Sequence, residues 1–354
     1  MAAEPGKFEG VKPVDERHRF DEAALAAWME AHVEGYAGPL SVSQFKGGQS
    51  NPTYRLDTPG RAYVLRRKPM GVLLPSAHAV DREFKVISAL SAQGFPVAKT
   101  YGLCEDTGVI GSMFYVMSLV EGRVYWNGLL PDHSPADRRG IYESEIATLA
   151  RLHNYDPEAI GLGDYGKPGN YFARQIDRWS KQYKASETET IDEANRLMEW
   201  LPGSVPEQER VSIVHGDFRI DNLMFHADRP EVAAVLDWEL STLGDPLADF
   251  TYYLMHWVMP PDGRSGLAGV DVKALGIPTI EEATELYCQA TNRSGLPNLD
   301  WYFAYNLFRL TGIVQGIAGR VRDGTAASAQ AVEMASKNRR LAEAAWSFAK
   351  RAGA

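Results

Sequence analysis

One stretch of this chain constrains its fold and its chemistry more than any other. It runs from His215 to Asn222, and Asp237 follows fifteen residues after Asn222. Short apolar runs, which are typical of buried strands, surround it at 211–214, 223–225 and 232–236. A hairpin after this loop would bring Asp237 back beside Asn222. The sequence therefore predicts that the carboxylates of Asp217 and Asp237 converge with the amide of Asn222.

These three side chains suit phosphoryl transfer. Asp217 can act as the catalytic base, because its carboxylate can accept or orient the proton of an attacking hydroxyl. Asn222 and Asp237 offer the hard oxygen ligands that Mg²⁺ prefers, and they could hold the metal against nucleotide phosphates. Such a transfer depends mainly on positioning and charge neutralisation, so it requires few further protein groups. The pattern predicts a Mg²⁺-dependent phosphotransferase.

The same residues resemble the aminoglycoside phosphotransferase-like family, a branch of the protein-kinase-like fold. Its signature is His-Gly-Asp, four residues, Asn, and then an Asp on the next strand. The run Gly-Asp-Pro-Leu-Ala-Asp at 244–249 also matches the family pattern. Within the family, segments 63–69 and 237–240 look most like the kinase domains found alongside acyl-CoA dehydrogenases. The resemblance extends from about residue 40 to the last helix, and it is most specific in the catalytic core.

The resemblance implies an α+β, bilobal protein-kinase-like fold. A small antiparallel β-rich lobe at 1–120 would bind nucleotide, and a larger, mainly helical lobe at 121–354 would hold the catalytic and substrate-binding residues. ATP and Mg²⁺ are the implied cofactors, and the crevice between the lobes is a common place for a ligand. Met117, Ser118 and Leu119 would form the hinge that hydrogen-bonds adenine.

Two other interpretations of the motif remain open. His215, Asp217, His226 and Asp237 could be the ligands of a metal hydrolase, and Asp and Asn also occur in ordinary turns. The ordered series of Asp217, Asn222, Asp237 and the Gly-Asp-Pro turn favours phosphotransfer over both. A further alternative is a catalytically weak nucleotide-binding interaction module on the kinase-like fold.

The small lobe contributes a second group of candidate residues. Backbone N–H groups of a Gly-containing turn can bind phosphate oxygens. A candidate turn of this kind, which could cover the phosphates of the nucleotide, contains Gly47, Gly48, Ser50 and Asn51. Arg66 aligns where most kinase-like proteins carry a phosphate-anchoring lysine, and we expect it to pair with Glu83 on the following helix. A guanidinium can bridge phosphate and carboxylate, but its geometry differs from that of an ammonium. The simpler interpretation is a surface ion pair of little energetic value.

The acceptor is less constrained. Candidate substrate contacts are Glu239, Tyr253, Trp257, Tyr305 and Arg309, although aromatic residues at helical spacing more often belong to a core. Kinases of polycationic aminoglycosides favour acidic clusters, whereas between Asp300 and Val332 only Asp323 is acidic. A small hydroxy compound, such as a hydroxyacyl-CoA or a related hydroxy acid, is therefore favoured over an aminoglycoside or another amino alcohol.

Charge and cysteine content limit the expected binding partners and the expected cellular compartment. A net charge of −9 argues against a nucleic-acid partner, which usually meets a basic face. Cys104 and Cys288 lie far apart in the sequence, so we do not expect a disulfide framework. We expect a protein of a reducing compartment. The sequence has no signal-like start and no apolar run of membrane-spanning length. We expect a cytoplasmic protein without a membrane partner, and its oligomeric state is left open.

Periodicity predicts most of the elements. Residues before Arg19 read as a loose lead-in, and Asp21 is the expected cap of the first helix, at 22–33. In the small lobe, the pattern predicts strands at 40–46, 53–57, 61–67, 100–104 and 113–119 and a helix at 79–92. In the large lobe, it predicts helices at 136–155, 171–183, 191–200, 247–257, 280–292, 301–321 and 328–349.

Overall fold

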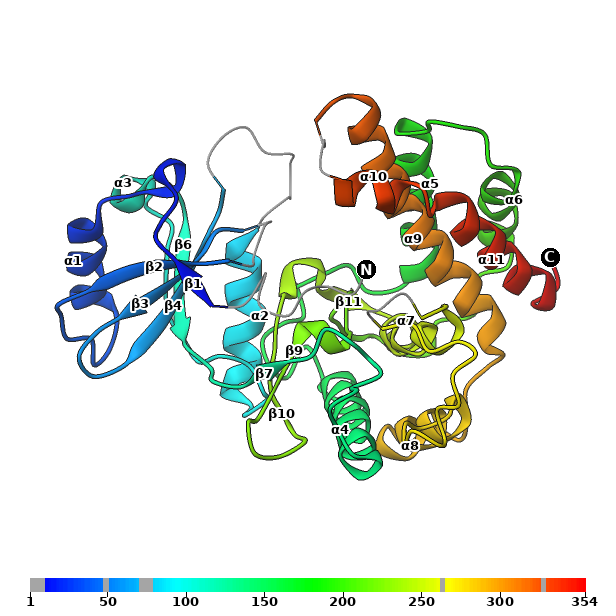
Figure 1. Cartoon of the computed structure of the whole chain (residues 1–354), viewed down its shortest axis with the longest axis horizontal. Helices are drawn as coiled ribbons and strands as arrows, with labels where there is room; N and C mark the ends of the chain where they lie inside the picture. The colour runs from blue at the N-terminus through cyan, green and yellow to red at the C-terminus, as the bar shows by residue number, and fades with distance from the viewer. Residues whose placement is uncertain (1–9, 47–50, 70–78, 262–264, 326–328) are drawn as a thin grey trace.

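A computed structural model describes residues 10–46, 51–69, 79–261, 265–325 and 329–354 of the chain. It has a small lobe built on one sheet and a larger, mainly helical lobe, as Figure 1 shows. This confirms the α+β, bilobal kinase-like fold class. No described helix is long and apolar enough to cross a membrane.

The small lobe is a six-stranded sheet in which every pair of neighbouring strands is antiparallel. Its spatial order is β1 (Val11–Lys12), β2 (Ser41–Phe45), β3 (Thr53–Asp57), β4 (Ala62–Arg67), β6 (Phe114–Ser118) and β5 (Thr100–Cys104). Three helices accompany it: α1 (Glu22–His32), α2 (Val80–Ala92) and the short α3 (Thr107–Ile110). Asp21 caps α1 as predicted, since its carboxylate accepts from the N–H groups of Ala23 and Ala24.

Helices α1 and α2 belong to different cores. Leu25 and Met29 of α1 are buried with Tyr54 and Leu56 of the sheet, in a core confined to the small lobe. Val86 and the other buried apolar residues of α2 belong instead to the main core of the large lobe. Helix α2 also contacts β5, β6 and the turn Trp238–Leu240. It therefore lies at the junction of the lobes and fixes the sheet against the catalytic segment (Figure 1).

The large lobe carries the remaining helices and two small sheets. The helices are α4 (Pro135–His153), α5 (Tyr171–Ala185), α6 (Asp192–Trp200), α7 (Pro246–Val258), α8 (Ile280–Ala290), α9 (Leu299–Arg322), α10 (Ala329–Ala335) and α11 (Asn338–Arg351). One sheet pairs β9 (Leu223–Phe225) with β10 (Val232–Val235) on one side and β7 (Arg123–Val124) on the other. The second pairs β8 (Ser212–Val214) with β11 (Thr242–Gly244). The β9–β10 hairpin is the one predicted after the catalytic loop.

Two predictions about the chain ends are wrong. The segment before Arg19 is no loose lead-in over its described part, because β1 pairs with β2 and Arg67 donates to the carbonyl of His18. These contacts are long-range, so local composition does not reveal them. The predicted helix at 328–349 is two helices, α10 and α11. The hydroxyl of Ser336 donates to the Glu333 carbonyl at this break, a local bond that competes with helix continuation.

Candidate active site

The loop that follows β8 is held from behind by α7. Asp249, in the first turn of α7, accepts hydrogen bonds from the backbone N–H groups of His215 (2.5 Å) and Gly216 (2.8 Å). Burial by itself raises the pKa of Asp249. The hydrogen bond with His153, the charges of His153 and His215 and the N–H of Gly216 together hold that pKa below its ordinary value. Gly216 has φ +88° and a Cβ there would lie 2.7 Å from the carbonyl oxygen of Leu240. The backbone path therefore requires glycine.

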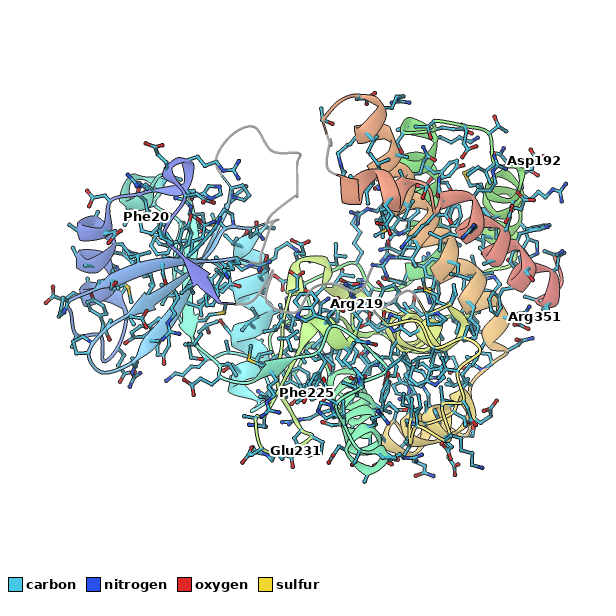
Figure 2. The ribbon with its side chains drawn as sticks, viewed as in Figure 1. Phe20, Asp192, Arg219, Phe225, Glu231 and Arg351 are labelled. Carbon is cyan, nitrogen blue, oxygen red and sulfur yellow. The ribbon has the colours of Figure 1, made fainter. Side chains whose placement is uncertain are left out.

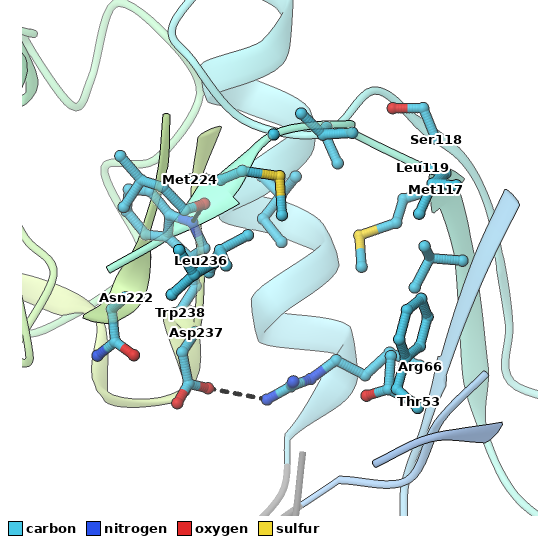
Figure 3. Close-up of a pocket in the computed structure, with 18 of the residues that line it drawn as sticks. Thr53, Arg66, Met117, Ser118, Leu119, Asn222, Met224, Leu236, Asp237 and Trp238 are labelled. Carbon is cyan, nitrogen blue, oxygen red and sulfur yellow. Dashed lines mark hydrogen bonds and ion pairs between the residues drawn. The ribbon is translucent and has the colours of Figure 1, made fainter. Parts of the chain in front are cut away.

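The carboxylate of Asp217 is held at both oxygens. Its Oδ2 accepts from Nδ2 of Asn222 (2.9 Å), and its Oδ1 accepts from the hydroxyl of Tyr252 (2.6 Å). Nδ2 of Asn222 also donates to the backbone carbonyl of Asp217 (2.8 Å). Because two acceptors fix the nitrogen, the amide oxygen of Asn222 is turned toward Asp237, as Figure 3 shows. That oxygen is therefore available to a metal.

Asp237 lies beside Asn222 because of the hairpin. The N–H of Leu236 donates to the carbonyl of Asn222 (2.8 Å), which closes the hairpin next to the catalytic loop. Asp237 itself has φ +60°, in the left-handed region that non-glycine residues seldom adopt. Such conformations cost free energy and cluster at functional sites. The sequence prediction that Asp217, Asn222 and Asp237 converge therefore agrees with the geometry.

Arg66 joins the two lobes at this point. Its Nε lies 2.7 Å from Oε2 of Glu83, the predicted partner, and its Nη2 lies 2.9 Å from Oδ1 of Asp237 (Figure 3). The Arg66 side chain is 12% exposed and that of Glu83 is 2% exposed. Glu83 also accepts from Nδ2 of Asn51 (2.8 Å) and from the hydroxyl of Tyr115 (3.1 Å). This is a buried network, so the interpretation of Arg66 as half of a surface pair is wrong.

A cavity of about 750 Å³ lies between the lobes. Met117, Ser118 and Leu119, the residues predicted to form the hinge, line it together with Arg66 and Glu83. Its further lining includes the two metal-ligand candidates and the apolar side chains of Val64, Ile87, Met224, Val235 and Leu236. Concave, mostly apolar sites with a few converging polar groups are typical of ligand pockets.

The chain enters the large lobe along one wall of this cavity, at Gly122. A Cβ at Gly122 would lie 2.3 Å from the carbonyl oxygen of Phe225. Glycine therefore allows the chain after the hinge to run directly against β9. This close approach brings β7 beside the hairpin that carries Asp237.

The other candidate residues have varied positions. Gly47, Gly48 and Ser50 lie outside the described residues, so their phosphate role stays a prediction. Asn51 is buried and bonded to Glu83. Glu239 lies 3.9 Å from Nη2 of Arg66, and burial together with the charge of Asp237 raises the pKa of Glu239 to about 7.

The aromatic candidates and Arg309 lie in the core of the large lobe. Nε1 of Trp257 donates to the carbonyl of Pro278, and Tyr305 stacks on Trp301. Tyr253 is 1% exposed, and Arg309 is 7% exposed and donates to the carbonyl of Gly216. None of the four lines the cavity. Their contact with substrate stays a prediction, and their burial favours packing and positioning roles.

Two residues at the site were not identified from the sequence. Tyr252 bonds Asp217. The sequence places it among the aromatic residues of the helical lobe and one helical turn after Asp249, and neither signal assigns it to the base. Arg219, near the centre of the molecule in Figure 2, pairs with Asp221 at 2.5 Å, and its Nε lies 3.9 Å from Oδ2 of Asp217. Arg219 lies within the motif itself, two positions after Asp217, so its charge was a usable signal.

The metal-hydrolase alternative finds no support in the geometry. Within the described ranges, no group of three or more His, Cys, Asp or Glu side chains could hold a metal. Both ring nitrogens of His215 have backbone partners, the carbonyl of Leu236 at 2.8 Å and the N–H of Asp217 at 3.2 Å. His226 contacts the guanidinium of Arg229 instead.

Comparison with known proteins decides the family. Residues 41–284 match the model of the phosphotransferase enzyme family. The chain belongs to this family. A crystal structure from Ralstonia eutropha, provisionally assigned as an aminoglycoside phosphotransferase, is 53% identical with a TM-score of 0.88, and the match covers 94% of this chain and 99% of that one.

Curated relatives extend the comparison. Mouse acyl-CoA dehydrogenase family member 10 is 42% identical over 345 residues, which cover 97% of this phosphotransferase and 32% of the relative. Human acyl-CoA dehydrogenase family member 11 is 39% identical over 341 residues, which cover 95% of this chain and 44% of that protein. The chain thus spans about a third of the first relative and less than half of the second. The predicted resemblance to the kinase domains of such proteins is confirmed.

Proposed function

We propose that this phosphotransferase moves the γ-phosphate of ATP to a hydroxyl of a small molecule in a Mg²⁺-dependent reaction. The observation that carries the proposal is the convergence of Asp217, Asn222 and Asp237 beside a cavity of about 750 Å³ between the lobes. Arg66 adds a positive charge on the small-lobe side of the same point.

Each residue has a role that follows from its contacts. Asp217 accepts or orients the hydroxyl proton, and its two donors hold the carboxylate in one direction. The oxygen of Asn222 and the carboxylate of Asp237 fit a magnesium ion, which would neutralise phosphate charge during transfer. Arg66, held by Glu83, is suited to a phosphate oxygen. The hinge at Met117–Leu119 lines the part of the cavity assigned to adenine.

The acceptor that we propose is anionic, a hydroxyacyl-CoA or a related hydroxy acid. Arg219, whose Nε lies 3.9 Å from Oδ2 of Asp217, places a positive charge beside the base, and this charge favours an anionic acceptor over a polycationic one. The names of the curated relatives are consistent with acyl-CoA chemistry. A solved neighbour at 16% identity was crystallised with AMP-PNP and hygromycin B, and its likeness concerns the fold alone.

A panel of acceptors tests the proposal. Mg²⁺ and ATP would be supplied with hydroxyacyl-CoAs, hydroxy acids, aminoglycosides or choline, and acceptor-dependent ADP release would be measured. We expect release with one anionic class, and we expect Asp217→Asn to reduce it by roughly 100-fold or more. Release with aminoglycosides or choline alone would reject the anionic acceptor. No release with any class, despite thermal stabilisation by Mg²⁺ and ATP, would favour a nucleotide-binding module.

A further inference from the structure

The base candidate is held by an element outside its own loop. Oδ2 of Asp217 is bonded by Asn222, five residues along the same loop, but Oδ1 is bonded by Tyr252 of helix α7 at 2.6 Å. Tyr252 is 4% exposed. A hydrogen bond from a hydroxyl to a carboxylate is short and strong, and it orients the acceptor.

Arg309 of helix α9 contacts both sides of this bond. Its guanidinium lies 4.9 Å from the centre of the Tyr252 ring, and its Nη2 donates to the carbonyl of Gly216, the residue before Asp217. The same guanidinium lies 5.8 Å from the ring of Trp179 on helix α5. Helices α5 and α7 both pack against α9. One buried arginine therefore links these helices to the loop that carries the base.

We propose that Tyr252 is a positioning residue for phosphoryl transfer, and that Arg309 acts through it and through the Gly216 carbonyl to hold the carboxylate of Asp217 in its reactive direction. This inference rests on the proposed function, in which Asp217 orients the acceptor hydroxyl. It assigns Arg309 to positioning rather than to substrate contact. It also means that helices of the large lobe orient the carboxylate of Asp217.

The position of these residues determines which kinetic constant they affect. Neither Tyr252 nor Arg309 lines the nucleotide cavity, so the loss of their contacts leaves nucleotide binding intact. Among the described residues, removal of the Tyr252 hydroxyl leaves the Asp217 carboxylate with Asn222 as its one hydrogen-bond donor and frees the carboxylate to turn. Misorientation of a reacting group lowers the rate of the bound complex. We expect Tyr252→Phe to lower kcat about tenfold, the size typical for the loss of a hydrogen bond to a charged group.

The matched control is Tyr183→Phe. Tyr183 is buried as well, in a separate cluster of α5, α6 and α11. Its hydroxyl has no hydrogen-bond partner among the described residues. Both variants lose one phenolic oxygen from a buried ring. We expect Tyr183→Phe to keep the kcat of the wild type, and we expect both variants to keep the KM for ATP and the thermal stabilisation by Mg²⁺ and ATP within about twofold of the wild type.

Arg309→Lys provides a second variant that keeps the positive charge but loses the planar fork. We expect its kcat to fall while the KM for ATP is kept. If Arg309 acts through Tyr252, the double variant will lose less activity than the product of the two single losses. Fully multiplicative losses would overturn the link between the two residues.

The outcomes separate this inference from the proposed function. If the wild type transfers phosphate and Tyr252→Phe matches it in kcat, the positioning role is overturned and the function stands. A rise in KM for ATP with kcat unchanged would also overturn the role, because it would reveal a general disturbance of the site. If the wild type transfers phosphate to no acceptor of the panel, both proposals fail. A fall in kcat alone, in Tyr252→Phe but not in Tyr183→Phe, supports the inference.

Discussion

The two sides of the candidate active site are built differently. On the large-lobe side, two parts of the catalytic loop have partners from helix α7: Asp249 holds the backbone, and Tyr252 holds Asp217. On the small-lobe side, the wall of the cavity is mostly apolar. Its main charged group is Arg66, which spans from Glu83 to Asp237.

This difference implies that other residues fix the catalytic loop before the substrate binds, whereas the contacts of Arg66 depend on the bound ligands. Groups that stabilise a transition state work best when other residues fix them before the substrate arrives. The loop meets this condition because Asp249 fixes its backbone and Tyr252 fixes the carboxylate of Asp217. Arg66, in contrast, contacts a carboxylate that we assign to the metal, so the binding of metal and phosphate has to share or replace that contact. Variants on the loop side should therefore change kcat, and variants on the Arg66 side should change the KM for nucleotide.

The largest effect after loss of Asp217 itself is expected from Asp249→Asn. The amide offers one acceptor and one donor to two backbone N–H groups, so one of these buried groups loses its partner. We expect kcat to fall by roughly 30-fold or more and the free energy of unfolding to fall by about 1–3 kcal/mol. Turnover and urea-induced unfolding would be measured in parallel.

The control for this variant is Asp245→Asn, four residues earlier on the same helix. Asp245 accepts from the N–H of Leu247 as the cap of α7, and asparagine caps helices equally well. Asp245→Asn therefore makes the same chemical change as Asp249→Asn but leaves the hydrogen bonds to the catalytic loop in place. Similar kinetics in the two variants would show that Asp249 serves only the helix, and the contrast between the two sides of the site would lose its basis.

The catalytic loop was predictable because its chemistry is local in sequence. Asp217, Asn222 and the hairpin to Asp237 follow from residue types and short spacings, and the Gly-Asp-Pro start of α7 was recognised as well. The periodicity of amphipathic helices also gives their positions, as for α5 and α6, whose ends differ from the prediction by at most two residues. Burial of one apolar face imposes this regular pattern on the sequence.

The remaining features depend on contacts between distant segments. The pairing of Arg66 with Asp237 joins residues 171 positions apart, and that of Arg309 with Gly216 joins residues 93 positions apart. No local pattern distinguishes a buried arginine that orients a loop from one that meets a substrate. Burial and direction of the side chain decide between these roles, and both result from the packing of whole helices.

A smaller effect on turnover, and a larger one on nucleotide binding, is expected from Arg66→Ala. The variant removes the cation that spans from Glu83 to Asp237 and leaves Glu83, which is 2% exposed, without its ion pair. We expect the KM for ATP to rise about tenfold, as for a charged hydrogen bond, while kcat falls by less. Steady-state kinetics with varied ATP would measure both constants.

Arg66→Lys refines this result. An ammonium keeps the charge but cannot bridge Glu83 and Asp237 with a planar fork. Its KM for ATP should therefore lie between those of the wild type and Arg66→Ala. An unchanged KM in both variants would exclude Arg66 from nucleotide binding. The expectation that the loop side determines kcat and the Arg66 side determines the KM for nucleotide would then be wrong.

The smallest effect on turnover is expected behind the loop, at Glu145 of α4. Burial raises the pKa of the Glu145 carboxyl to about 8, whereas the ordinary value for glutamate is 4.5. Between about pH 5 and 8 the unfolded chain therefore loses this proton while the folded protein keeps it. The free energy of unfolding should accordingly fall as pH rises, by about 1 kcal/mol per pH unit.

Glu145→Gln should remove this dependence, because the amide is neutral at every pH in both states. We expect the variant to match the wild type near pH 4, below the ordinary pKa of glutamate, and to be the more stable protein at pH 8, with kcat unchanged at neutral pH. Urea-induced unfolding at several pH values would measure the slope. Equal slopes in the two proteins would mean that Glu145 is ionised in the fold. The packing behind the loop would then tolerate a charge, and the rigidity that we assign to the loop side would depend on Asp249 and Tyr252 alone.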